Sequence, residues 1–201
     1  MLLVLATKNQ GKIREIEKIL RMPGLQFRSL LDYPDLPDIQ EDGQTFLENA
    51  FKKAQACAQA TSRPTLADDS GLEVDCLNGA PGIYSARFSG TEATDEANNR
   101  KLLSLLEGIP EERRTARFVC RMVLYLPEGT WVGTEGFCQG TITHAPTGEH
   151  GFGYDPIFYL PEFNKTMAEL PLEEKNRISH RAQALQKIRQ HLWKILKTNG
   201  A

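Results

Sequence analysis

The hydrophobic positions alternate along the chain between strand-like runs and helix-like spacings. Residues 2–6 form a continuous apolar run, which is typical of a buried strand. A polar loop follows, and Pro23-Gly24 ends the next segment. That segment has an apolar face at helical spacing, made of Ile13, Ile16, Ile19 and Leu20. A strand, a loop and a helix in this order predict an α/β protein.

A second helix is predicted to begin at residue 46. Thr45 and Glu48 have the spacing of a capping box. The residues expected to face inward are Phe46, Ala50, Ala54, Cys57 and Ala58. Residues 32–44 are acidic and contain two prolines, so we expect a loop before this helix.

The second half of the chain repeats this alternation. Helices are predicted over residues 94–106 and 179–196. Residues 116–126 and 131–138 predict an antiparallel hairpin, and residues 141–143 an additional strand. Four residues of the first of these strands are expected to share a face, namely Phe118, Cys120, Met122 and Leu124.

Composition narrows the class of protein. A chain of 201 residues suits one domain over residues 1–201, with room for two lobes. The net charge of −2 disfavours a protein that grips nucleic acid over a long footprint. No apolar run is long enough to cross a membrane, and the first residues lack the basic leader of a signal peptide. The four cysteines form no CxxC pair, which fits reduced thiols and predicts a cytoplasmic protein.

Two adjacent carboxylates, Asp68 and Asp69, follow the apolar run of residues 65–67. Ser70 and Gly71 come directly after them, so we expect the strand to end here in a turn. Carboxylates in that position are well placed to hold a hard cation such as Mg²⁺. A plain polar turn is the alternative interpretation, because Asp, Ser and Gly are the usual turn formers.

The loop of residues 7–12 lies between the first predicted strand and helix. Backbone N–H groups at a helix start favour a bound anion. Lys8 and Lys12 add positive charge, while Thr7 and Asn9 add hydrogen-bonding groups. The spacing is not that of a Walker A loop. A phosphate-binding loop and a surface loop with two solvated lysines are the two interpretations.

A third carboxylate, Glu41, could complete a Mg²⁺ shell begun by the two aspartates. Asp42 and Glu48 compete for this role, although Glu48 has the capping position. Lys53 lies on the helix that follows. Taken singly, Glu41 would be a solvated loop charge and Lys53 part of a solvated helix face.

Residues 151–156 place two aromatic residues between glycines and before a proline. An aromatic ring offers a nucleobase a stacking surface worth roughly 1–3 kcal/mol. A core strand entered through a glycine turn is the alternative, and it is favoured for Tyr154 more than for Phe152, so Phe152 is the stronger candidate for such a surface.

Three cationic or titratable residues, Lys175, His180 and Arg181, cluster around the start of the last predicted helix, with Ser179 as its N-cap. Cations at a helix start oppose the helix dipole, so a bound polyphosphate or a keto oxygen would explain them. The alternative is that Arg177 and Arg181 pair with nearby glutamates on the surface.

Six motifs occur in one order along nearly the whole chain. They are ATKNQGK at residues 6–12, DGQTFLENA at 42–50, ADDSGL at 67–72, GAPGIYSAR at 79–87, GFGYDP at 151–156 and ISHR at 178–181. Together they closely resemble the bacterial dITP/XTP pyrophosphatase family, the Ham1-like inosine triphosphatases. One departure concerns residue 40, which is Gln where many relatives have an acidic residue, so the extra metal ligand is placed on Glu41.

The resemblance implies an α/β fold with a long curved mixed sheet flanked by helices that form two lobes. It implies a homodimer that uses Mg²⁺ and hydrolyses dITP, ITP, XTP and dXTP to the monophosphate and pyrophosphate. Asp69 would be the acid/base residue, and Glu41, Asp68 and Asp69 would meet the metal. The substrate-binding residues implied are Thr7, Lys8, Asn9, Gln10, Gly11, Lys12, Lys53, Ser70, Phe152, Gly153, Tyr154, Asp155, Lys175, His180 and Arg181.

Two other functions remain open. A Maf-like pyrophosphatase would prefer dTTP or modified pyrimidine nucleotides to ITP. A nucleotide-binding sensor would bind ITP in Mg²⁺ without releasing pyrophosphate.

Overall fold

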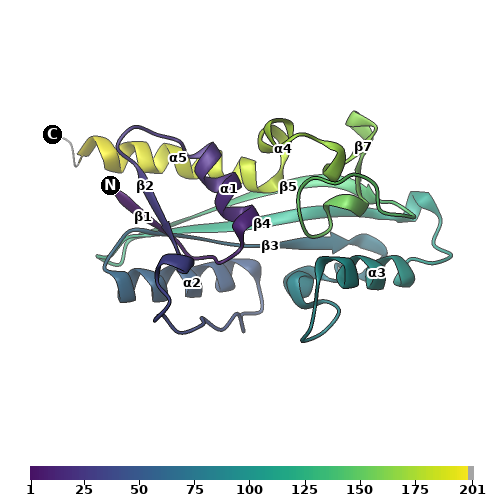
Figure 1. Cartoon of the computed structure of the whole chain (residues 1–201), viewed down its shortest axis with the longest axis horizontal. Helices are drawn as coiled ribbons and strands as arrows, with labels where there is room; N and C mark the ends of the chain where they lie inside the picture. Colours follow the sequence, from purple (N-terminus) through teal and green to yellow (C-terminus); the bar gives the residue numbers. More distant parts are fainter. Residues whose placement is uncertain (199–201) are drawn as a thin grey trace. The chain divides into compact units, whose positions relative to one another are not determined.

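The computed structural model describes residues 1–198 as an α/β fold with a seven-stranded sheet (Figure 1). The sheet has the strand order β2-β1-β3-β4-β5-β6-β7. Its strands are β1 (Leu2–Leu5), β2 (Gln26–Ser29), β3 (Thr65–Val74), β4 (Thr115–Tyr125), β5 (Trp131–Ile142), β6 (Phe158–Leu160) and β7 (Lys165–Thr166). β1 pairs in parallel with β2 and β3, whereas β6 pairs antiparallel with β5 and β7. The predicted mixed α/β architecture is therefore confirmed.

The helices are α1 (Gln10–Ile19), α2 (Phe46–Thr61), α3 (Asp95–Leu105), α4 (Leu172–Ile178) and α5 (His180–Thr198). Short 3₁₀ turns occupy Leu30–Asp32, Asp75–Leu77, Gly82–Arg87, Glu111–Arg113, Asp155–Ile157, Pro161–Phe163 and Met167–Glu169. Within residues 1–198, no helix combines the length and apolar character that crossing a membrane requires. The four cysteines, Cys57, Cys76, Cys120 and Cys138, are all free.

The chain divides into two compact units. Unit 1 comprises residues 1–69, 120–136 and the chain from residue 181 onward, and unit 2 comprises residues 70–119 and 137–180. Strands β3, β4 and β5 contribute residues to both units.

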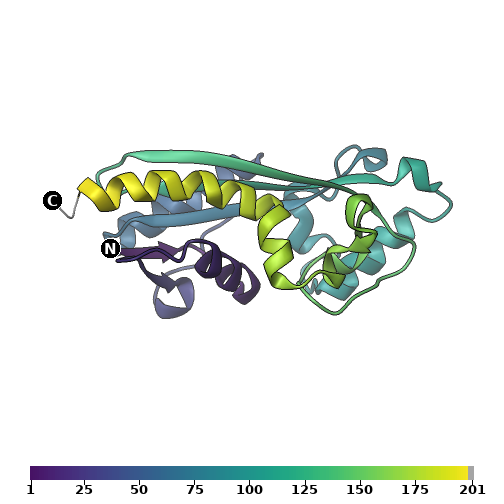
Figure 2. The ribbon, with the colours of Figure 1, turned by 90° about the horizontal axis from the view of Figure 1, so that it is seen from above.

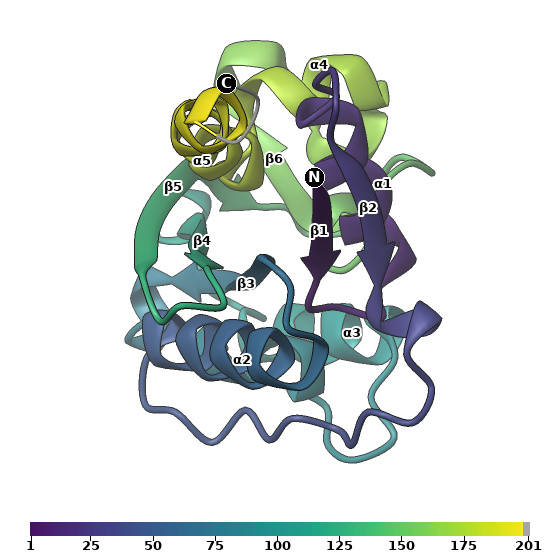
Figure 3. The same cartoon turned by 90° about the vertical axis from the view of Figure 1, so that its left-hand side faces the viewer.

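Unit 1 has helices on both faces of its strands. Seen from the side shown in Figure 3, α1 and α5 lie on one face and α2 on the other. α5 runs along the hairpin strand β5 (Figure 2), where Thr134 Oγ1 donates to Ala184 O and Lys187 Nζ donates to Glu135 O. The α1/α5 face packs a core that includes Leu5, Ile16, Leu66, Met122, Leu185 and Ile188. The α2 face packs a second core that includes Ala50, Ala54, Cys57, Ala67 and Val123.

Unit 2 has a single core between α3 and its own strands, including Leu72, Leu102, Phe118, Ile142, Tyr154, Phe158 and Met167. A close approach of two strands explains one glycine here. A Cβ on Gly140 of β5 would lie 2.4 Å from Tyr159 O and 2.7 Å from the Phe158 ring, so only glycine fits.

The local signals for α2 are confirmed. Thr45 Oγ1 accepts from Glu48 N at 3.1 Å, and all five predicted inward residues are buried. The reciprocal half of the cap differs from the capping box, because Glu48 Oε2 accepts from Gln44 N at 2.7 Å instead of from Thr45 N.

Several predicted boundaries are wrong. β2 and α4 were not expected, because each is a short element whose apolar pattern is too brief to recognise. The separate strand at 141–143 is instead the end of β5, which continues through Gly136 and Gly140. Asp68 and Asp69 lie in the middle of β3, not at a strand end. Buried partners for both carboxylates make this mid-strand position stable.

Candidate functional site

Asp68 and Asp69 point to opposite faces of β3, as successive strand residues do. Asp68 pairs with residues of α1 and α5, whereas Asp69 contacts residues of α2. Both are buried in unit 1, with 2% and 5% of their surface exposed. The structure therefore places the two carboxylates on opposite faces of β3, and the metal-binding role of Asp68 stays a prediction.

Asp68 belongs to a buried network of four charges. Its Oδ2 lies 3.0 Å from Lys12 Nζ and 3.3 Å from Arg181 Nη2. Arg181 Nη1 also donates to Glu15 Oε2 at 2.6 Å. Burial by itself would raise the pKa of Asp68, but Lys12 and Arg181 outweigh it and hold that pKa well below the ordinary value. The alternative that Arg181 pairs with surface glutamates is wrong.

Asp69 is held from the side of α2. Asn49 Nδ2 donates to Asp69 Oδ2 at 3.0 Å, and Asn49 Oδ1 accepts from Gly43 N at 2.8 Å. A Cβ on Gly43 would lie 2.6 Å from that amide oxygen, so glycine is required there. Lys53 Nζ lies 3.7 Å from Asp69 Oδ1 and 3.0 Å from Glu41 Oε1. Lys53 is buried, so the interpretation of a solvated helix face is wrong.

This environment changes the acidity of Asp69. Burial raises the pKa of Asp69 to about 6, with Lys53 opposing the shift and the Glu41 charge adding to it. A carboxyl group whose pKa lies near the working pH is suited to accept a proton from water. Asp69 is therefore the best general-base candidate that unit 1 offers.

Glu41 and Asp69 are also the carboxylates that converge, since both lie against the Lys53 ammonium. Across residues 1–198, no group of three or more His, Cys, Asp or Glu side chains is arranged to hold a metal ion. Two carboxylates nevertheless fit Mg²⁺, which commonly binds one or two of them together with substrate phosphates and water. Of the competing ligands, Asp42 pairs with Lys52 at 2.7 Å and Glu48 caps α2.

The raised pKa of Asp69 predicts a pH-dependent stability. A carboxyl whose pKa is higher in the folded state stabilises the fold below about pH 4, and that contribution is lost as the pH rises through 6. With a chelator present at pH 7.5, the free energy of unfolding of Asp69→Asn should therefore exceed that of wild type by about 1–3 kcal/mol. Urea denaturation measures this difference as a higher midpoint concentration for the variant. The difference should vanish at pH 4, and a variant less stable than wild type at pH 7.5 would contradict this account.

The loop of residues 7–12 uses its polar groups internally. Asn9 Oδ1 caps α1 by accepting from Lys12 N at 3.0 Å, and Thr7 Oγ1 accepts from Asn9 N at 3.1 Å. Lys8 pairs with the exposed Asp38 at 2.6 Å. Lys12 is largely buried against Asp68, so the interpretation of two solvated lysines is wrong for Lys12, whereas Lys8 and its partner Asp38 are exposed at the surface. Gln10 and Gly11 form the first turn of α1, and phosphate binding there stays a prediction.

Unit 2 brings together Phe152, Asp155 and Lys175. Asp155 Oδ2 accepts from Phe152 N at 2.9 Å and lies 2.5 Å from Lys175 Nζ. The same ammonium lies 4.6 Å from the centre of the Phe152 ring. Asp155 and Lys175 are both buried, so they organise the loop that carries Phe152.

The other predicted residues of unit 2 have mixed positions. Tyr154 is a core residue whose hydroxyl donates to Ser85 O at 2.8 Å. The His180 ring stacks on Phe118 with ring centroids 4.8 Å apart. Ser70 follows Asp69 in β3 and is half-buried. Roles for these residues in binding substrate stay predictions.

Four residues that organise these sites were missed, namely Glu15, Asn49, Asp95 and Asn99. Glu15 and Asn49 are polar residues buried on helices, and their partners Arg181 and Asp69 lie far away in sequence. A polar residue close to an apolar helical face was the only signal available.

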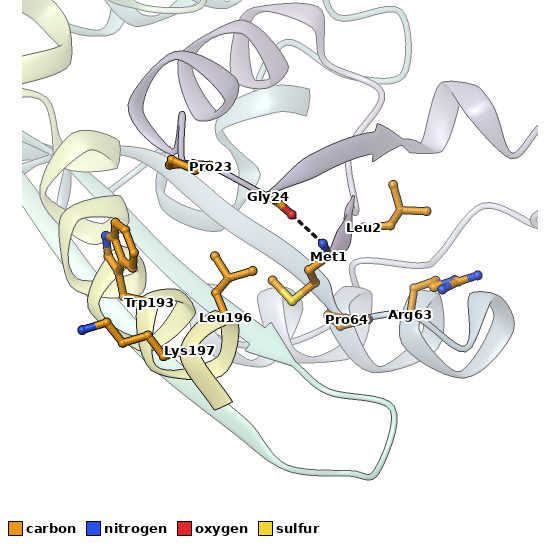
Figure 4. A pocket seen from close by; sticks show the side chains of 9 residues that line it. All are labelled: Met1, Leu2, Pro23, Gly24, Arg63, Pro64, Trp193, Leu196 and Lys197. Carbon is orange, nitrogen blue, oxygen red and sulfur yellow. Dashed lines mark hydrogen bonds between the residues drawn. The ribbon is translucent and has the colours of Figure 1, made fainter. Parts of the chain in front are cut away.

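A separate pocket of about 500 Å³ in unit 1 is lined by Met1, Leu2, Pro23, Gly24, Arg63, Pro64, Trp193, Leu196 and Lys197 (Figure 4). Among these nine residues there is no carboxylate and no predicted site residue. The Met1 amino group donates to Gly24 O, and both residues line the pocket. This pocket is therefore distinct from the carboxylate site.

The chain is similar in sequence and in fold to proteins of known family. A protein named dITP/XTP pyrophosphatase from Desulforamulus reducens is 54% identical over 93% of both chains, and one from Geobacter sulfurreducens is 55% identical over 94% of this chain and 96% of its own. The structure of the Staphylococcus aureus Ham1 protein has a TM-score of 0.86 and 42% identity, covering 96% of this chain and 99% of that one. Residues 3–191 match the model of the Ham1 family. With that match over nearly its whole length, the chain belongs to the Ham1 family.

Proposed function

We propose that this protein is a hydrolase that converts dITP, ITP, XTP and dXTP to the monophosphate and pyrophosphate. The observation that carries the proposal is the Asp69 carboxyl, buried beside Lys53 and Glu41 with a pKa near 6. Support comes from relatives 54% and 55% identical that are named dITP/XTP pyrophosphatases. Such an activity would remove deaminated purine nucleotides from the nucleotide pool.

Asp69 has the central part in the proposed reaction. Its carboxylate orients a water molecule and accepts a proton as that water attacks the α-phosphorus. Asn49 fixes the carboxylate through Oδ2, which leaves Oδ1 directed toward Lys53. Pyrophosphate leaves, and within unit 1 we assign Lys8, Lys12 and Lys53 to stabilise the negative charge that develops on it.

Mg²⁺ is the cofactor that we propose, with Glu41 and Asp69 as its protein ligands. When bound, the ion would neutralise phosphate charge and lower the pKa of water. Lys53 contacts both carboxylates and would keep them oriented toward the same point. Asp68 is not included in this proposed pair, because it is held by Lys12 and Arg181.

Recognition of the base follows from hydrogen bonding. Inosine and xanthine present a keto oxygen at C6, whereas adenine presents an amino group. Donors from His180 or from backbone N–H groups would meet a donor in ATP, and such a mismatch can reject a substrate by up to about 10⁴-fold. Phe152 would supply a stacking surface for the base.

We also propose that the protein forms a homodimer and acts in the cytoplasm.

The test is pyrophosphate release from dITP, XTP, dATP, dGTP and dTTP, each with and without Mg²⁺. We expect dITP and XTP to be hydrolysed at least about 100-fold faster than dATP, because a buried donor faces the wrong group in adenine. Omitting Mg²⁺ should lower the rate at least tenfold.

Each other outcome contradicts part of the proposal. Similar release from all purine triphosphates would contradict the base recognition, and preference for dTTP would favour a Maf-like activity. Binding of dITP in Mg²⁺ without pyrophosphate release would contradict hydrolysis and favour a sensor. Full activity after removal of Mg²⁺ with a chelator would contradict the metal site.

A further inference from the structure

Gly153, in the loop that carries Phe152, is held by α3 through the two peptide units that flank its Cα. Asp95 Oδ2 accepts from Gly153 N at 2.6 Å, and Asn99 Nδ2 donates to Gly153 O at 3.0 Å. Asp95 and Asn99 are four residues apart, so they lie on the same face of the helix. Gly153 has a φ of +63°, a left-handed conformation that glycine adopts without strain.

The peptide on the other side of Phe152 is also held. Phe152 N donates to Asp155 Oδ2, and Lys175 pairs with that same oxygen. Phe152 therefore stands between two hydrogen-bonded positions, one made by Asp155 and one made by α3. The backbone on both sides of the ring is fixed by side chains from distant parts of unit 2.

Asn99 is unusual among the buried amides of α3. Its Oδ1 is buried and, within the part of the chain that the structure describes, has no hydrogen-bond partner. The neighbouring Asn98, by contrast, donates to Ala86 O and accepts from Ser89 N. A buried carbonyl oxygen without a donor opposes folding. Packing alone therefore does not explain Asn99, whereas its bond to Gly153 does.

We propose that Asp95 and Asn99 are positioning residues that place the Phe152 ring for stacking against the purine base. They act through Gly153 and do not contact the substrate themselves. The inference rests on the proposed function, in which Phe152 stacks on the base. The inference adds that α3 contributes to the affinity for the base of the nucleotide and leaves the affinity for the phosphates unchanged.

The experiment measures KM and kcat for dITP in Mg²⁺ with Asn99→Ala and Asp95→Ala. We expect KM to rise about 10-fold, because stacking of one base on an aromatic ring contributes an affinity gain of that order. kcat should change less than about threefold, since the loss concerns binding and not the transition state. Inorganic tripolyphosphate, which has no base, should inhibit wild type and variants with equal inhibition constants.

Two matched controls separate positioning from a general loss of structure. Asn98→Ala removes a buried amide from the same helix and should lower the melting temperature while KM stays within about twofold. Asp95→Asn keeps an acceptor for Gly153 N and should restore most of the affinity that Asp95→Ala loses. Because Asp95 is exposed, its variants test the inference even where Asn99→Ala does not fold.

The failure modes are distinct. Absence of pyrophosphate release by the wild type would overturn the proposed function itself. An active wild type together with unchanged KM in both alanine variants would overturn only the positioning role. Equal weakening of dITP and tripolyphosphate would do the same, because it would place the effect on the phosphates.

Discussion

Asp69→Asn is expected to lower the turnover of dITP at least about 10³-fold while the protein keeps its fold, since the change removes the proposed general base and a proposed metal ligand together. Asparagine has the shape of aspartate and still offers an oxygen to Asn49 Nδ2. It accepts no proton near neutral pH and carries no charge for a cation. The measurement is pyrophosphate release in saturating Mg²⁺, with circular dichroism to show that the fold is retained.

Asp42→Asn and Glu41→Gln are the matched variants for this experiment. Asp42 is exposed and pairs with Lys52, so its replacement should leave turnover unchanged. Glu41→Gln should raise the Mg²⁺ concentration needed for half-maximal activity by about 10–100-fold, the usual cost of losing a residue at a metal site. Near-normal turnover of Asp69→Asn, or a larger loss in Asp42→Asn than in Glu41→Gln, would show that the site is assigned to the wrong carboxylates.

Those features that depend on neighbouring residues could be predicted from the sequence. The start of α2 is specified by Thr45 three residues before Glu48, and its buried face by apolar residues at helical spacing. The strands of the β4–β5 hairpin were recognisable for the same reason, because period-two alternation is a local signal. The family motifs predict Asp69 as the reactive carboxylate, but they give no information about the residues that surround it.

What could not be predicted depends on partners that are distant in sequence. The pair Asp68-Asp69 resembles a turn because Asp, Ser and Gly usually form one. The pair lies in a strand because each carboxylate has a partner on its own face of the sheet. Asp68 is paired with Arg181, 113 residues away, and Asp69 with Asn49, 20 residues away. Similarly, Asn99 and Gly153 are 54 residues apart, so the role of α3 in holding the loop had no local signal.

Arg181→Met should strongly destabilise unit 1, lowering the free energy of unfolding by about 3–5 kcal/mol because it leaves buried charges unpaired. Arg181 is 1% exposed and joins Glu15 to Asp68. Methionine approximates the length of the side chain but pairs with neither carboxylate. The change corresponds to a fall of roughly 6–20 °C in melting temperature for a chain of this size, which calorimetry measures directly.

A double variant distinguishes lost pairing from lost packing. Arg181→Met leaves the buried Glu15 carboxylate without its arginine partner, and Glu15→Gln removes that charge. The double variant should therefore be more stable than Arg181→Met alone. Asp68 keeps Lys12 in both variants. Arg28→Gln breaks the exposed pair with Asp32 and should cost less than about 1 kcal/mol, the usual value of a surface ion pair.

The pH dependence of stability provides a second test of whether Arg181 acts through its charge. Lys12 and Arg181 hold the pKa of Asp68 below its ordinary value, so their stabilisation is present above about pH 4 and is lost as the pH falls further. The stability difference between wild type and Arg181→Met should therefore narrow in acid. A difference that is constant from pH 7 to pH 3 would mean that Arg181 stabilises unit 1 by packing alone, and its charge would then have no part in holding Asp68 away from Asp69.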